Sequence, residues 1–265
     1  MADRTSDGTA FEINGPDNAP VIVLIHGLGM SRKMWQWHVP ALAERYHVVS
    51  YDLCGHGEST RPDARLSLPV FADQLRALLD HADIAKAAIV GYSLGGMINR
   101  RFTMDHPDRV AALVILNSPH ERGPEAQKLV EERAADTAAG GPAANIDTSI
   151  ARWFTPDFRE TRPDIIALAR QWILANDPEV YAQARQVLAQ GVVELVHPQP
   201  PIAAPSLVIT TENDSGSTPA MSHGIAREIA GAEIVIIPSL QHMGLVEEPE
   251  LFTNPVLRFL DETLP

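Results

Sequence analysis

The sequence predicts an α/β protein with a central, mostly parallel β-sheet and helices on both of its faces. Two observations support this fold class. Short β-branched apolar runs alternate with helix-periodic runs along the chain. The strand-like runs are apolar throughout, as expected of strands buried on both faces. The chain has 265 residues, of which 45% are hydrophobic and 21% charged, which is typical of a folded globular protein.

The expected strands are continuous apolar runs at 21–25, 47–51, 87–92, 110–117, 206–211 and 233–237. Helical periodicity lies between them. In the run 71–79, for example, Phe71, Leu75, Leu78 and Leu79 share one helix face. A final helix is expected at 250–263.

The interval 119–205 interrupts this alternation, because it contains helix-like stretches and no good strand. The helical stretches lie at about 124–138, 159–175 and 178–190, and several prolines separate them. Ligands of open α/β sheets bind beyond the carboxyl ends of the strands. We therefore expect a core made of 1–118 and 206–265, and a helical cap, or lid, made of 119–205.

Composition argues against several classes of function. The chain has 34 acidic and 21 basic residues, a net charge of −13, and no basic stripe, so nucleic-acid binding is not expected. No run approaches the ~18 apolar residues of a membrane span, and the first residues lack the apolar centre of a signal peptide. We expect a cytoplasmic protein with no membrane partner, while a homo-oligomer remains open.

Metal and cofactor chemistry is not expected either. The single cysteine, Cys54, excludes a disulfide within the chain and a multi-cysteine metal site. The ten histidines include no His-Glu-x-x-His spacing. We interpret Cys54 as a small packing residue, since no basic partner is evident for its thiol.

The sharpest signal is Gly91-Tyr-Ser93-Leu-Gly95, which follows an apolar strand and opens a helix. A serine in such a tight strand-to-helix turn is strained and exposed above the sheet, and glycines on either side relieve the crowding. A glycine-rich turn without catalytic function is the alternative. The flanking strand and helix favour Ser93 as a nucleophile.

A serine nucleophile needs a histidine base and a carboxylate that orients it. Asp214 follows the strand 206–211, and His242 follows the strand 233–237. Both positions lie just past the carboxyl end of a strand, like Ser93. Asp214 is therefore the favoured acid, and Glu212 is its competitor.

Acyl transfer also requires two donors aimed at the developing oxyanion. The backbone N–H of Leu94, directly after the serine, is one candidate. The second is the N–H of Leu28 in the loop His26-Gly-Leu-Gly29, where glycines allow close approach to a ligand.

These motifs resemble those of α/β-hydrolase-fold enzymes over nearly the whole chain. Further shared marks are Asp52-Leu-Cys-Gly-His-Gly-Glu-Ser59 and His106-Pro-Asp-Arg109. Two stretches of the expected cap, Arg152-Trp-Phe-Thr-Pro-Asp-Phe158 and Asn176-Asp-Pro-Glu-Val-Tyr181, are similar to 3-oxoadipate enol-lactonases. Cys54 departs from the family pattern, in which arginine is frequent at that position.

The resemblance implies a cofactor-free serine hydrolase of a small carboxylic ester or lactone, with Ser93, Asp214 and His242 as its triad. A carbon–carbon bond hydrolase of aromatic ring-cleavage products would use the same triad, and a non-catalytic ligand receptor could reuse the fold.

Two groups of residues are candidates for contacting the substrate. Apolar walls are expected from Tyr92, Met243 and the cap aromatics Trp153, Phe154, Phe158 and Trp172, whose alternative role is the cap's own core. Free carboxylates of a substrate could pair with Arg122, Arg152 or Arg170, although helix arginines are usually solvated.

Overall fold

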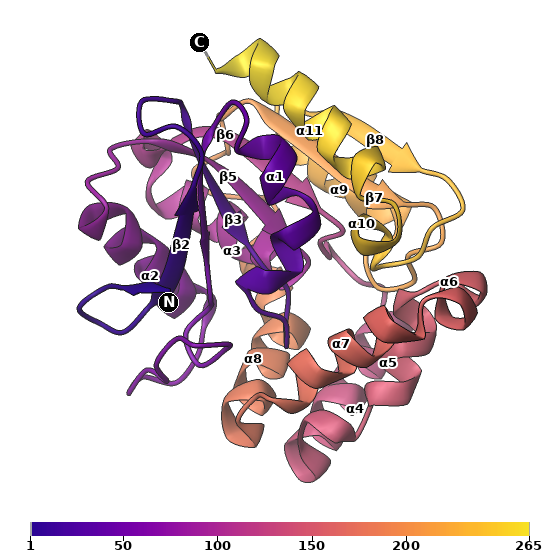
Figure 1. Ribbon diagram of the computed structural model, residues 1–265. Coiled ribbons are helices and arrows are strands. Elements are labelled where there is room, and N and C mark those ends of the chain that lie inside the picture. Colours follow the sequence, from indigo (N-terminus) through magenta and orange to yellow (C-terminus); the bar gives the residue numbers. More distant parts are fainter. Residues whose placement is uncertain (1, 265) are drawn as a thin grey trace.

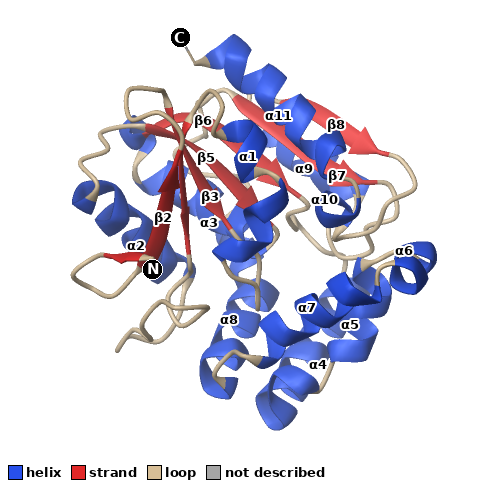
Figure 2. Ribbon diagram, in the orientation of Figure 1, coloured by secondary structure: helices blue, strands red, loops and turns tan. Residues whose placement is uncertain are grey.

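The computed structural model describes residues 2–264, so Met1 and Pro265, at the two ends of the expected core, lie outside the described residues. Within the described part, eight strands form one sheet in the order β1-β2-β4-β3-β5-β6-β7-β8 (Figures 1 and 2). The pairs β1–β2 and β2–β4 are antiparallel, and the other neighbours are parallel. The predicted fold class is confirmed. The strands are β1 (Asp3–Arg4), β2 (Ala10–Asn14), β3 (Val21–Ile25), β4 (His47–Tyr51), β5 (Ala87–Tyr92), β6 (Val110–Leu116), β7 (Ser206–Thr211) and β8 (Glu233–Ile237).

The six expected strands appear as β3 to β8, and β6 ends at Leu116, one residue earlier than expected. The two strands that sequence patterning missed, β1 and β2, extend the sheet beyond β4. Strand β1 has only two residues, and β2 buries Ala10 and Phe11 while Glu12 is exposed. Neither has the continuous apolar run that marks a strand buried on both faces.

Helices cover both faces of the sheet. Helices α1 and α11 pack together on the face that is in front in Figure 1, and α2 and α3 pack together on the other. Helix α2 buries the predicted face, including Phe71 and Leu75, and the hydroxyl of Ser67 accepts the N–H of Val70 at its start. The α-helices are α1 (Val39–Leu42), α2 (Leu68–His81), α3 (Leu94–Asp105), α4 (Pro124–Gly140), α5 (Ile146–Trp153), α6 (Pro156–Thr161), α7 (Pro163–Leu174), α8 (Pro178–Gln190), α9 (Pro219–Glu228), α10 (Gly244–Glu247) and α11 (Pro249–Thr263).

Between β6 and β7 the chain forms helices α4 to α8, which lie together at one end of the sheet (Figure 1). The single helix expected at 159–175 is instead two helices, α6 and α7, because Pro163 interrupts it. Proline disfavours helical geometry in the residue before it, and Arg162 has φ −126° and ψ 56°. Helix α5 was not expected. The division of the chain into a core and a separate cap stays a prediction.

Candidate active site

Ser93 stands at the turn between β5 and α3 in a backbone conformation that is unusual for a side-chain-bearing residue. Its φ is +55° and its ψ is −111°. The two glycines of the motif have no room for a side chain. A Cβ on Gly91 would lie 2.2 Å from the Gly95 carbonyl oxygen, and one on Gly95 would lie 2.3 Å from the Ile25 carbonyl oxygen. The motif therefore presses α3 against β5 and β3 and holds the serine above the sheet.

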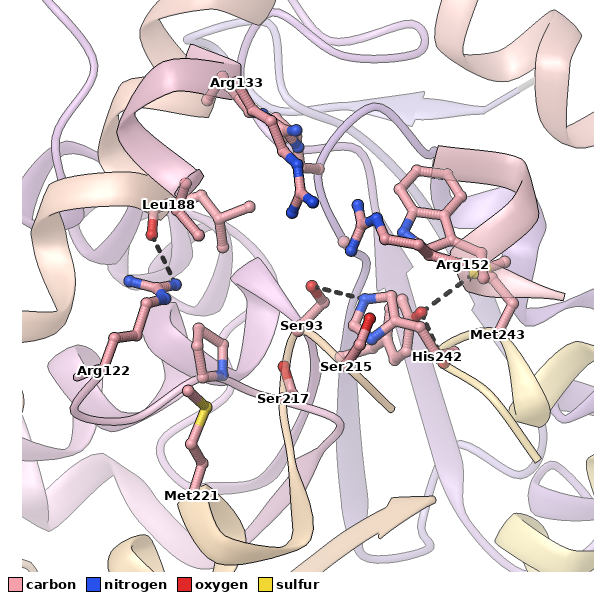
Figure 3. A pocket seen from close by; sticks show the side chains of 18 of the residues that line it. Ser93, Arg122, Arg133, Arg152, Leu188, Ser215, Ser217, Met221, His242 and Met243 are labelled. Atoms are coloured by element: carbon pink, nitrogen blue, oxygen red, sulfur yellow. Dashed lines mark hydrogen bonds between the residues drawn. The ribbon is translucent and has the colours of Figure 1, made fainter. Parts of the chain in front are cut away.

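The structure brings Ser93, His242 and Asp214 together in a chain of hydrogen bonds. Nε2 of His242 lies 3.2 Å from Oγ of Ser93 (Figure 3). Nδ1 of His242 lies 2.6 Å from Oδ2 of Asp214. All three residues are buried. With the proton on Nδ1, the ring donates to Asp214 and its Nε2 can accept the serine proton.

Asp214 is held in place by four donors. Its Oδ1 accepts the backbone N–H groups of Gly216 and Ser217 at 2.8 and 2.9 Å, and its Oδ2 accepts from Nδ2 of Asn117 as well as from His242. Burial disfavours the charged carboxyl. The adjacent His242 charge and these hydrogen bonds outweigh burial and lower the pKa of Asp214 below its ordinary value.

Glu212, the competing acid, lies elsewhere. It is exposed, and its carboxylate accepts the backbone N–H of Ser239 at 2.9 Å. Asn117 was not predicted as a site residue. Its position one residue past β6, beside the acid-bearing loop, is the signal that could have identified it as a residue that orients Asp214.

The loop that carries Leu28 runs directly over the serine turn. A Cβ on Gly27 would lie 3.3 Å from Cβ of Ser93. The buried His26 ring anchors the loop, because its Nε2 accepts the Leu53 N–H at 2.9 Å. Leu94 is the first residue of α3, where helix N–H groups lack partners within the helix. Leu28 lies in a loop beside Ser93 and lines the same cavity, and Leu94 follows Ser93 directly; their role as oxyanion donors stays a prediction.

A cavity of about 380 Å³ opens over Ser93, and Tyr92, Trp153 and Met243 all line it. The hydroxyl of Tyr92 donates to the His242 carbonyl oxygen at 3.0 Å, and its ring lies 5.1 Å from the histidine ring. The N–H of Met243 donates to the Trp153 carbonyl oxygen at 2.8 Å, which joins α5 to the histidine loop. The three predicted substrate-contact residues therefore surround His242.

The other cap aromatics, Phe154, Phe158 and Trp172, have the alternative role of packing and do not form walls of the cavity. Phe154 stacks on Phe158 with ring centroids 5.6 Å apart, and Trp172 packs against Trp37. None of these rings lines the cavity. Their side chains instead pack where helices α6 and α7 meet other elements, since an aromatic ring buries most apolar area in a helix contact.

Of the arginines proposed to meet carboxylates, Arg122 and Arg152 line the cavity, whereas Arg170 forms an ion pair with Asp147 away from it. Sequence reasoning missed Arg133 and Arg185, which also line the cavity. Over residues 2–264, no group of three histidine, cysteine or acidic side chains could hold a metal ion, and no helix is long and apolar enough to cross a membrane.

Comparison with known proteins agrees with this architecture. Residues 20–249 match the family model described as alpha/beta hydrolase fold. The chain belongs to this family, and the protein is a hydrolase of the α/β fold. The resemblance to enol-lactonases is also confirmed by individual relatives.

One relative is 3-oxoadipate enol-lactonase 2 of Acinetobacter baylyi, 29% identical over 91% of this chain and 89% of that protein. A second, from the same organism, is (E)-2-((N-methylformamido)methylene)succinate hydrolase, 27% identical over 91% and 90% of the two chains. The crystal structure of the enol-lactonase from Burkholderia xenovorans LB400 superposes with a TM-score of 0.90 at 30% identity, covering 98% of this chain and 100% of that one.

Proposed function

We propose that the protein is a serine hydrolase that cleaves a small carboxylic ester or lactone through an acyl-enzyme on Ser93. The observation that carries this proposal is the hydrogen-bonded chain Ser93–His242–Asp214 at the floor of the cavity. The similarity to enol-lactonases supports the ester or lactone class.

In the first half-reaction, Oγ of Ser93 attacks the substrate carbonyl carbon while Nε2 of His242 takes the hydroxyl proton. The negatively charged oxygen of the tetrahedral intermediate accepts hydrogen bonds from the N–H groups of Leu28 and Leu94. In comparable enzymes each such donor lowers the barrier by about 3–4 kcal/mol. His242 then gives its proton to the leaving alkoxide or enolate oxygen as the carbon–oxygen bond breaks, and the acyl group stays on Ser93.

In the second half-reaction, His242 takes a proton from water, whose oxygen attacks the acyl carbon. Collapse of the new intermediate returns the proton to Ser93 and releases the acid. Asp214 remains ionised throughout and stabilises the imidazolium that forms in each step. Segment 119–205 supplies Trp153 and the arginines as walls, so we propose that it acts as the cap.

The proposal is tested with a fluorophosphonate probe and p-nitrophenyl acetate. We expect the probe to label the protein, and Ser93→Ala to lose both labelling and turnover while it keeps the wild-type melting temperature. Ser222→Ala is a matched control, because Ser222 is also buried but does not line the cavity. Wild-type labelling in Ser93→Ala would reject the mechanism.

The same assay separates the alternatives. A non-catalytic receptor would bind ligand but show neither labelling nor turnover. A carbon–carbon bond hydrolase would be labelled on Ser93 and would cleave ring-cleavage dienoates in preference to esters and lactones.

A further inference from the structure

The cavity above Ser93 is strongly basic, although the whole chain has a net charge of −13. No aspartate or glutamate is among the described residues that line it. Four arginines from the helical segment 119–205 line the cavity, and we call them the arginine cluster: Arg122, Arg133, Arg152 and Arg185.

The members of the arginine cluster have no acidic partner among residues 2–264, unlike Arg162 and Arg170. Within residues 2–264, none of the four lies within 4.0 Å of a carboxylate oxygen. Arg162 and Arg170, on the same segment but outside the cavity, each pair with an aspartate. Of the five arginines in 119–205 that have no such partner among residues 2–264, four line the cavity, and the fifth, Arg159 on α6, lies outside it.

Arg185 is buried and the other three arginines are partly buried, and holding such charges without an acidic partner is unfavourable for the free protein. Arg185 is only 6% exposed, and its Nε has no hydrogen-bond partner among residues 2–264. Within the same residues, the buried Nε atoms of Arg122 and Arg152 also lack partners. Replacing a buried charge by an apolar residue of similar volume is often neutral or stabilising. The presence of arginines in the cavity therefore points to a function that needs their charge.

The four charges are also close enough to act on one another. Burial, and then the charge of Arg185, lowers the pKa of Arg122 to about 10. Burial, followed by the charges of Arg133 and Arg185, lowers the pKa of Arg152 to about 10. With pKa values of about 10, Arg122 and Arg152 remain protonated near neutral pH, so the cavity holds positive charges that repel each other until an anion enters.

The cluster surrounds the reacting serine. In Figure 3, Arg122 lies on one side of Ser93, while Arg133 and Arg152 point into the cavity from other directions. Arg122 is fixed by hydrogen bonds from Nη2 to the Leu188 carbonyl oxygen at 3.2 Å and from Nη1 to that of Ala189 at 3.3 Å. A ligand whose ester carbonyl sits on Ser93 therefore has guanidinium groups on more than one side.

We infer that the substrate is an ester or lactone with at least two free carboxylates, which the arginine cluster binds. This inference rests on the proposed function. A guanidinium fork matches a carboxylate in planar, bidentate geometry. One carboxylate would leave most of the cluster uncompensated, whereas two or more would occupy groups on different sides of Ser93. The cavity volume of about 380 Å³ suits a small polycarboxylate.

The test uses three p-nitrophenyl esters with the same leaving group and increasing charge: the butyrate, the monosuccinate and the tricarballylate with two free carboxylates. We expect kcat/KM to rise about tenfold or more with each carboxylate. In Arg133→Gln, the ratio of tricarballylate to butyrate kcat/KM should fall by about tenfold to 100-fold. Arg170→Gln is the matched control, with the same change outside the cavity, and should keep the wild-type ratio.

A binding measurement separates this inference from the proposed function. Free tricarballylate is titrated calorimetrically into Ser93→Ala protein, with and without Arg133→Gln. Binding that weakens at least tenfold in the double variant supports the cluster even if no ester is hydrolysed, in which case only the proposed function fails. Two results would refute carboxylate binding by the arginine cluster while leaving the serine hydrolase proposal standing. One is hydrolysis through Ser93 at equal kcat/KM for the butyrate and the charged esters. The other is tricarballylate binding of equal affinity with and without Arg133→Gln. Tighter binding of inorganic phosphate than of tricarballylate would overturn the assignment to carboxylates.

Discussion

Replacing Asp214 with asparagine changes one buried oxygen into an NH2 group, and the structure fixes which one. Oδ1 accepts two backbone N–H groups, from Gly216 and Ser217, at 2.8 and 2.9 Å. Only an oxygen can accept these hydrogen bonds. The asparagine oxygen is therefore expected at the Oδ1 position, and its NH2 group is expected to face His242 and Asn117.

An NH2 group opposite Nδ1 of His242 reverses the hydrogen bond between them. Nδ1 must now accept, so the ring proton moves to Nε2, the nitrogen that lies 3.2 Å from Oγ of Ser93. That nitrogen can no longer take the serine proton. The corresponding change in serine proteases lowers kcat by about 10⁴, which equals about 5 kcal/mol of barrier, and we expect a loss of the same order here.

The assay compares kcat on p-nitrophenyl acetate and the fluorophosphonate labelling rate in wild type, Asp214→Asn and Glu212→Gln. The glutamate variant makes the same carboxylate-to-amide change at an exposed position two residues away, and it should retain wild-type rates. A folded Asp214→Asn protein with less than a tenfold loss would refute the role assigned to the carboxylate.

Three further outcomes follow from burial. Trp153→Ala should raise KM for esters with bulky acyl groups and leave KM for acetate esters unchanged. Its melting temperature should fall less than that of Trp35→Ala, because removing the core Trp35 side chain is expected to cost about 3–5 kcal/mol of stability. A larger fall in melting temperature for Trp153→Ala than for Trp35→Ala would make Trp153 a packing residue. Burial lowers the pKa of His26 and His38 from 6.5 to about 4, so the unfolded chain binds more protons between these values. Urea unfolding should therefore show stability that is full above about pH 6.5 and declines towards pH 4, by about 1 kcal/mol per pH unit for each histidine, whereas a flat profile would contradict this. Burial raises the pKa of the Cys54 thiol to about 12, so a disulfide reagent at pH 8 should label it only after unfolding, and rapid labelling of the native protein would show that the thiol is accessible.

The parallel part of the sheet was predictable because its strands, apart from the partly buried edge strand β8, are buried on both faces and therefore largely apolar without alternation. Strand β2 carries a different signal, since only Ala10 and Phe11 are buried and its partners are antiparallel. In the helical segment, the effect of Pro163 on Arg162 decides where α6 ends and α7 begins. A proline inside a helical pattern indicates such a boundary, but helix periodicity on both sides of it concealed the break.

Ser93, His242 and Asp214 could be located because each follows a strand of a parallel sheet, and the carboxyl ends of such strands meet at one edge. The strand order brings β5, β7 and β8 to the same side of β3, so loops that are distant in sequence converge. Steric demands within single motifs added to this, as at Gly91 and Gly95, where no side chain fits.

Only two members of the arginine cluster, Arg122 and Arg152, were candidates from the sequence, and the reason lies in how the helices of segment 119–205 pack. Arg122 precedes α4, and Arg133, Arg152 and Arg185 lie on three different helices. Periodicity says which residues share a face of one helix, but not which faces of α4, α5 and α8 meet over the sheet. An arginine in a helical pattern is usually solvated, and only the packing of α4 against α8 and of α5 against the His242 loop turns these side chains into the cavity. The parallel sheet fixes the positions of the reacting groups, whereas the packing of the helices fixes which charges face them, and hence which substrates are favoured.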